Sequence, residues 1–113
     1  MDKTPAISYL RTDLCGVRQR WDEIRMRSLA KRLGYNLRKT ITFSALSDDR
    51  ISRLLDQIER EQAEAVFVPH LDHLEGEHNR VIAVADVVVD VDEVYVRWSP
   101  IGAVLDDPEQ VDG

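Results

Sequence analysis

Hydrophobic and polar residues follow two different periods along the chain, and the changes of period mark the expected elements. Residues 6–11 and 37–43 are rich in apolar, β-branched and aromatic side chains, and residues 65–68 form a short apolar run closed by a proline. These three segments are predicted to be strands, the last of them buried on both faces. Apolar residues recur three and four positions apart in residues 17–33 and 51–58, which predicts two helices.

The first of these helices is expected to begin at Val17, after a turn at residues 14–16, and to end before Gly34. Its apolar positions are interpreted as one stripe that faces the core, so Trp21 is assigned to the core as well. The stripe comprises Val17, Trp21, Ile24, Met26, Leu29, Ala30 and Leu33.

The pattern is weaker in the last third of the chain. Residues 77–85 are expected to form a short helix, residues 87–91 a fourth strand and residues 94–98 a fifth. The polar pair between the last two segments is compatible with a turn, which leaves open whether residues 87–98 form one strand or two. The expected core positions of the short helix are Val81, Ile82 and Ala85.

The order of these elements predicts an α/β fold. Two strand–helix–strand crossovers imply a mainly parallel sheet of four or five strands, with helices on both faces in a three-layer arrangement. A chain of 113 residues is one domain by size. We expect residues 1–98 to form this domain and residues 99–113 to be a C-terminal tail that is partly disordered.

The composition excludes some classes of protein but does not identify one. Hydrophobic residues make up 43% and charged residues 32%, and no apolar run approaches the length of a membrane span. The N-terminus does not resemble an export signal, so a cytoplasmic protein without a membrane partner is expected. The single cysteine, Cys15, is interpreted as a small apolar filler. Gly16 stands alone where a phosphate-binding loop would be rich in glycine, so no cofactor is expected.

Charge is distributed unevenly along the chain. The net charge is −6, but residues 1–40 hold ten Lys or Arg against four Asp or Glu. Three arginines in that part, Arg18, Arg25 and Arg32, recur every seven residues and are predicted to share one helix face. They are candidate interaction residues for an acidic protein partner, a second copy of the chain or DNA. The alternative is a solvated face with ion pairs such as Arg18 with Asp22.

Three segments in the right order resemble the catalytic domain of the serine recombinases, the resolvase and invertase family. They are Tyr9-Leu10-Arg11-Thr12-Asp13, the helix pattern Ile51-x-x-Leu54-Leu55, and AVFVPHLDHLEG at residues 65–76. The family patterns are Tyr-x-Arg-x-Ser, Arg-Pro-x-Leu-x-x-Leu-Leu and a third strand followed by Asp-Arg-Leu-x-Arg. The resemblance extends over about residues 6–91 and implies a resolvase-like, Rossmann-like fold.

The same comparison implies that the family chemistry is lost. Asp13 stands where the family has its serine nucleophile, and a carboxylate there would repel a phosphodiester. Asp48 stands at the arginine that begins the family's helix, with Arg50 two residues further on as a partial substitute. His73 and Gly76 replace two further arginines, so that only Arg11 and Asp72 are retained. The resemblance therefore implies no catalytic residues, and the chain is expected to be a non-catalytic, resolvase-like domain that acts through association with itself or with another protein.

A second hypothesis concerns a metal ion. Asp13, Asp72 and His73 could converge at the strand ends and hold a divalent cation, which would suit a repurposed, metal-dependent enzyme that processes phosphate compounds. The preferred interpretation is that Asp72 caps a turn or pairs with Arg11 while His73 is solvated.

Overall fold

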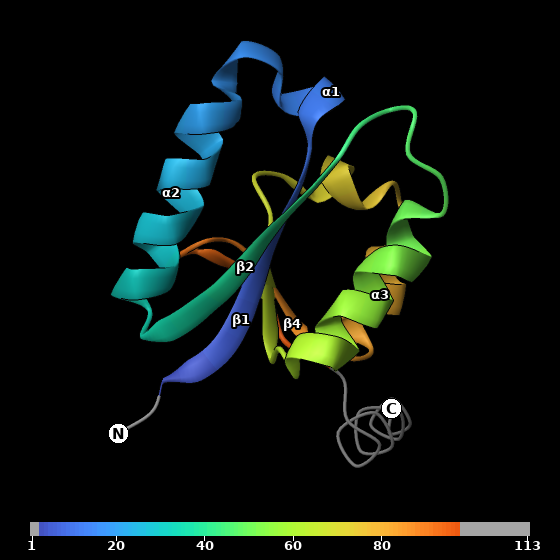
Figure 1. The fold of residues 1–113 in the computed structure, drawn as a ribbon. Coiled ribbons are helices and arrows are strands. Elements are labelled where there is room, and N and C mark those ends of the chain that lie inside the picture. The colour runs from blue at the N-terminus through green and yellow to red at the C-terminus, as the bar shows by residue number, and fades with distance from the viewer. Residues whose placement is uncertain (1–2, 98–113) are drawn as a thin grey trace, which may run out of the picture.

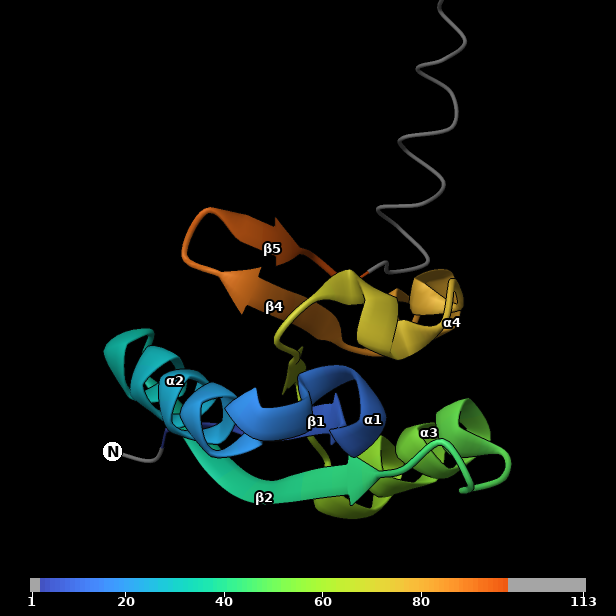
Figure 2. The same ribbon diagram turned by 90° about the horizontal axis from the view of Figure 1, so that it is seen from above.

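A five-stranded mixed sheet forms the centre of the protein, with the strands in the order β2-β1-β3-β4-β5 (Figures 1 and 2). The computed structural model describes residues 3–97. The first four strands run parallel, and β5 is antiparallel to β4. The chain from residue 86 to residue 95 thus forms two strands joined by a tight turn. The strands are β1 (Thr4–Arg11), β2 (Tyr35–Phe43), β3 (Ala65–Phe67), β4 (Asp86–Asp90) and β5 (Glu93–Tyr95).

Helices cover both faces of this sheet, as the sequence predicts. Figure 2 shows α2 on one side of the strands and α3 and α4 on the other. The helical segments are α1 (Thr12–Cys15), the 3₁₀ turn η1 (Gly16–Arg18), α2 (Gln19–Arg32), α3 (Arg50–Glu61), the 3₁₀ turn η2 (Leu71–Leu74) and α4 (His78–Ile82). None of the helices between residues 3 and 97 has the length and apolar character needed to cross a bilayer.

The two faces of the sheet have separate cores because side chains alternate along each strand. On β1, Ile7 and Tyr9 pack with α3 and α4, whereas Ala6 and Leu10 pack under α2. All of β3 is buried, as expected for a strand covered on both faces. The expected inward positions of the short helix, Val81, Ile82 and Ala85, are also buried.

The prediction for the first helix is wrong at its N-terminal end. Residues 12–18 form α1 and η1 rather than a simple turn, and α2 begins at Gln19. Trp21 is 66% exposed and Ile24 52% exposed, so the core assignment of Trp21 is incorrect. Ile24 and Met26 are two residues apart, a rotation of about 200° on a helix. The apolar residues therefore make two stripes on opposite sides of α2, and the buried one includes Met26, Leu29 and Ala30.

Two expectations lie outside the described residues. These are the end of the last strand at Trp98 and the tail at residues 99–113.

Candidate functional site

Polar side chains gather where β1, β2 and β3 end. β1 ends at Arg11, β2 continues into the loop that leads to α3, and β3 continues into η2. In open parallel sheets, ligands usually bind beyond the carboxyl ends of the strands, where the strand order reverses. The sheet order places that point between β1 and β3 in this chain.

Two carboxylates hold Arg11 at the carboxyl end of these strands. Its Nε and Nη2 donate to the two Asp13 carboxylate oxygens at 3.1 and 2.6 Å, which is a bidentate ion pair. Its Nη1 lies 3.9 Å from Glu75 Oε2. The hydrogen bond from Arg11 keeps the pKa of Asp13 below its ordinary value, so Asp13 is an anion at neutral pH.

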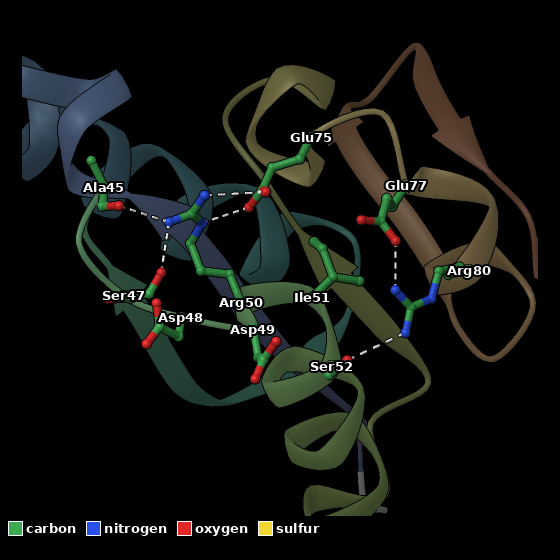
Figure 3. Close-up of a pocket in the computed structure, with 10 residues that line it drawn as sticks. All are labelled: Ala45, Ser47, Asp48, Asp49, Arg50, Ile51, Ser52, Glu75, Glu77 and Arg80. Carbon is green, nitrogen blue, oxygen red and sulfur yellow. Dashed lines mark hydrogen bonds and ion pairs between the residues drawn. The ribbon is translucent and has the colours of Figure 1, made fainter.

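Arg50, the first residue of α3, reaches the same carboxyl end of the sheet (Figure 3). Its Nε donates to Glu75 Oε2 at 2.6 Å and its Nη2 donates to Glu75 Oε1 at 3.2 Å. Its Nη1 donates to the backbone carbonyl groups of Ser44, Ala45 and Ser47 at 2.8–3.1 Å. The hydrogen bond between the two side chains lowers the pKa of Glu75 and raises that of Arg50.

The hydroxyl group of Tyr9 is close enough to these ion pairs for their charges to affect its pKa. Tyr9 is fully buried, and its Oη has no hydrogen-bond partner among residues 3–97. Burial, together with the negative charge of Glu75, raises the pKa of Tyr9 to about 12. The Tyr9 ring packs edge to face against Phe43, with 5.8 Å between ring centroids.

His73 is buried rather than solvated, which corrects the preferred interpretation of the sequence. It is only 4% exposed, and its Nδ1 accepts a hydrogen bond from the Arg11 backbone N–H at 2.9 Å. Burial lowers the pKa of His73, so the imidazole is neutral at pH 7. The side chain therefore fastens η2 to the end of β1.

Asp72 lies outside the group of paired charges formed by Arg11, Asp13, Arg50 and Glu75, which we call the strand-end cluster. Its side chain is 80% exposed and lies 3.4 Å from His70 Nδ1, so the pairing with Arg11, one of its two expected roles, is wrong. The cap of η2 is instead His70, whose Nδ1 accepts a hydrogen bond from the Asp72 backbone N–H at 3.1 Å. Across residues 3–97, no group of three or more His, Cys, Asp or Glu residues is placed to hold a metal ion. Asp13, Asp72 and His73 therefore do not form the metal site that the sequence suggested.

A pocket of about 380 Å³ opens beside Arg50, between the loop before α3 and the segment before α4 (Figure 3). Its charged lining consists of four carboxylates and two guanidinium groups, and both guanidinium groups are paired. Arg50 is bound by Glu75, and Arg80 Nη1 donates to Glu77 Oε1 at 2.5 Å. The excess of negative charge opposes the binding of a phosphate. The carboxylates belong to Asp48, Asp49, Glu75 and Glu77.

The remaining positions compared with the family lie at the rim of this region. Asp48 lines the pocket, and its carbonyl group accepts a hydrogen bond from Arg53 at 3.3 Å. Gly76 has a φ of +78°, which follows the left-handed conformation of Glu75 and suits glycine. Sequence reasoning gave no role to Glu75 or to the Tyr9 hydroxyl group, although both lie within the segments that carry the resemblance.

The three arginines predicted to form a stripe have different environments. Arg25 donates to the Pro69 carbonyl group at 3.2 Å and lies 3.9 Å from Asp90 Oδ2. Arg32 is exposed in the last turn of α2, and Arg18 is exposed in η1, before the helix begins. Asp22 is 7% exposed, so its expected place on a solvated face is wrong. Arg18 and Arg25 nevertheless line one pocket and share one side of the helical segment.

The chain matches none of the protein-family models, curated proteins or solved structures with which it was compared.

Proposed function

We propose that this chain is a non-catalytic, resolvase-like domain that acts through protein association. The proposal has two parts: the strand-end cluster has no chemical function, and the outer side of α2 binds protein. Each part rests on separate contacts.

The lack of chemistry is supported by the ion pairs at the strand ends. A phosphoryl-transfer site needs a nucleophile and cationic groups that are free to stabilise the developing charge. Asp13 occupies the position of the family nucleophile and is bound by Arg11, while Glu75 binds Arg50. An incoming phosphodiester would have to displace a carboxylate and would then lie beside a second one.

The observation that carries the association function is the apolar outer side of α2. Val17 is fully exposed, and Trp21 and Ile24 are more than half exposed. Trp21 and Ile24 are three positions apart on α2, so they lie on one side of that helix, and Val17 precedes them in η1. A tryptophan and two aliphatic side chains flanked by arginines are typical of the centre of a protein interface. We call Val17, Trp21 and Ile24 the outer stripe.

Site-specific photo-crosslinking tests the association. A benzophenone amino acid replaces Trp21 in the full chain, and in a matched control it replaces Arg60, which is exposed on α3. We expect a discrete protein adduct from position 21 and none from position 60. The captured protein, once purified, should bind the wild-type chain and fail to bind the Ile24→Glu variant. Absence of an adduct at position 21 would overturn the proposal.

A cleavage assay tests the absence of chemistry. The purified chain is incubated with supercoiled DNA, with and without divalent cations, and covalent adducts are trapped by denaturation. We expect no nicking and no adduct. Strand cleavage or an adduct that disappears in Asp13→Ala would show that the strand-end cluster is an active site.

A further inference from the structure

We propose that the partner of this surface is a second copy of the chain, bound across a two-fold axis that places the outer stripe of each copy against β5 of the other. This inference rests on the proposed association function and names its partner.

The first observation is that part of the sheet face beside α2 has no covering helix. Val88 of β4 is buried under α2, and Val94 of β5 lies directly opposite Val88 in the antiparallel pair. Directly opposite residues point to the same side of a sheet, so Val94 lies on the α2 side. Val94 is 41% exposed and Val96, two residues further, is 69% exposed. Val94 therefore leaves an apolar surface uncovered on the α2 side of the edge strand β5, and the exposed Val96 follows directly after that strand.

The second observation is the charge on either side of the boundary between α2 and this surface. The α2 side carries Arg18 of η1 with Arg25 and Arg32 of α2, whereas Asp90 ends β4 and Asp92 lies in the turn to β5. Arg25 Nη1 lies 3.9 Å from Asp90 Oδ2, which marks where the basic and acidic parts meet. Figure 2 shows this turn next to α2 on the same side of the sheet. Each part also has exposed apolar residues.

A surface of this kind is complementary to itself. When a two-fold axis passes through the boundary of a basic and an acidic part, the basic part of each copy faces the acidic part of the other. The apolar residues are matched by the same rotation, because the outer stripe then faces Val94 and Val96. One chain thus supplies both halves of the contact. With few apolar residues on each side, we expect a reversible dimer rather than a permanent one.

Sedimentation velocity on the full chain tests the dimer. Concentrations from about 10 µM to about 1 mM cover the range expected for a weak, reversible contact. We expect the average mass to rise with concentration and to stop at two chains. A chain that stays monomeric throughout, or whose mass rises beyond two chains, overturns the two-fold arrangement.

Charge reversal tests which surfaces meet. One variant carries Arg18→Glu and Arg32→Glu, and a second carries Asp90→Lys and Asp92→Lys, so that both halves of the surface have the same sign. Each variant alone should dimerise at least about tenfold more weakly than wild type. A mixture of the two should recover the wild-type dimer, because each reversed half then meets an opposite charge. A mixture that fails to recover it overturns the proposal.

Matched controls separate specific contacts from general charge effects. Asp56→Lys with Glu59→Lys makes the same charge change as the second variant on the exposed side of α3, and it should leave dimerisation unchanged. Asp90 accepts a hydrogen bond from the Val91 N–H, so the second variant could lose stability. If its melting temperature falls, Asp92→Lys alone replaces it.

The outcomes also distinguish this inference from the proposed function. A monomeric wild-type chain that still gives an adduct to another protein at position 21 retains the association function and overturns the dimer. A chain that forms neither adduct nor dimer overturns both.

Discussion

Arg50 and Glu75 are joined by two hydrogen bonds, the shorter of them 2.6 Å, although they are 25 residues apart in the chain. The pair connects the first turn of α3 to the residue that ends η2. Because Arg50 also binds three carbonyl groups of the preceding loop, the contact fixes two loops at the end of the sheet at once. It also pairs the Arg50 guanidinium group, which would otherwise be free to bind an anionic ligand.

Replacement of Glu75 by Gln should make the free energy of unfolding depend less on pH in the acid range. The folded-state pKa of Glu75 lies below its ordinary value of 4.5, so the unfolded chain takes up the proton first as the pH falls. The stability from the ion pair is therefore present above pH 4.5 and is lost below it. We expect Glu75→Gln to unfold at lower urea than wild type at pH 7, and the difference to shrink at pH 3.5. Glu59→Gln, on the exposed side of α3, should show no such change.

Replacement of Tyr9 by Phe should stabilise the protein or leave it unchanged. The Tyr9 hydroxyl group is buried without a partner among the described residues, and such a group costs about 1–3 kcal/mol of desolvation. Phe keeps the packing against Phe43. We expect the free energy of unfolding to rise by up to about 1 kcal/mol. A fall of more than about 1 kcal/mol would mean that the hydroxyl group has a partner in solution.

His73 should make the protein less stable in mild acid. Its pKa in the folded state is lowered from 6.5, because burial disfavours the charged form. The unfolded chain then binds more protons as the pH falls below 6.5, and stability decreases until the folded-state pKa is reached. His73→Asn offers an oxygen in place of Nδ1 to the Arg11 N–H and does not titrate, so its melting temperature should vary less between pH 7 and pH 5. A His73→Asn variant with the wild-type pH profile would contradict the assignment of this pH dependence to His73. His78→Asn is the matched control and should keep the wild-type profile.

Trp21 and Met26 should differ strongly in their contribution to stability, although both lie on α2. Trp21 is 66% exposed, so Trp21→Ala should change the free energy of unfolding by no more than about 0.5 kcal/mol. Met26 is 1% exposed, and Met26→Ala should cost about 2–5 kcal/mol through lost burial and a cavity. Chemical denaturation at a concentration that keeps the chain monomeric measures both. Equal losses would place Trp21 in the core.

The sequence by itself determined the class of fold. The β-branched runs, the helical spacing of Ile51, Leu54 and Ile58, and the buried run before Pro69 reflect local preferences and burial patterns that do not depend on distant partners. The strands, α3 and the buried residues of α4 follow these patterns. The same rule failed on α2, because one-dimensional spacing does not say which of two apolar stripes faces the sheet.

Tertiary structure alone decided the state of the strand-end cluster and the shape of the outer surface. Asp13, Glu75 and Arg50 are separated by tens of residues, and the sheet order brings their side chains to one edge. An ion pair depends on distances of a few ångströms, which no spacing in the sequence specifies. The burial of His73 and the exposure of Trp21 likewise depend on which elements pack above them. Local sequence therefore sets the elements of this protein, and their packing decides which side chains are satisfied inside it and which remain available to a partner.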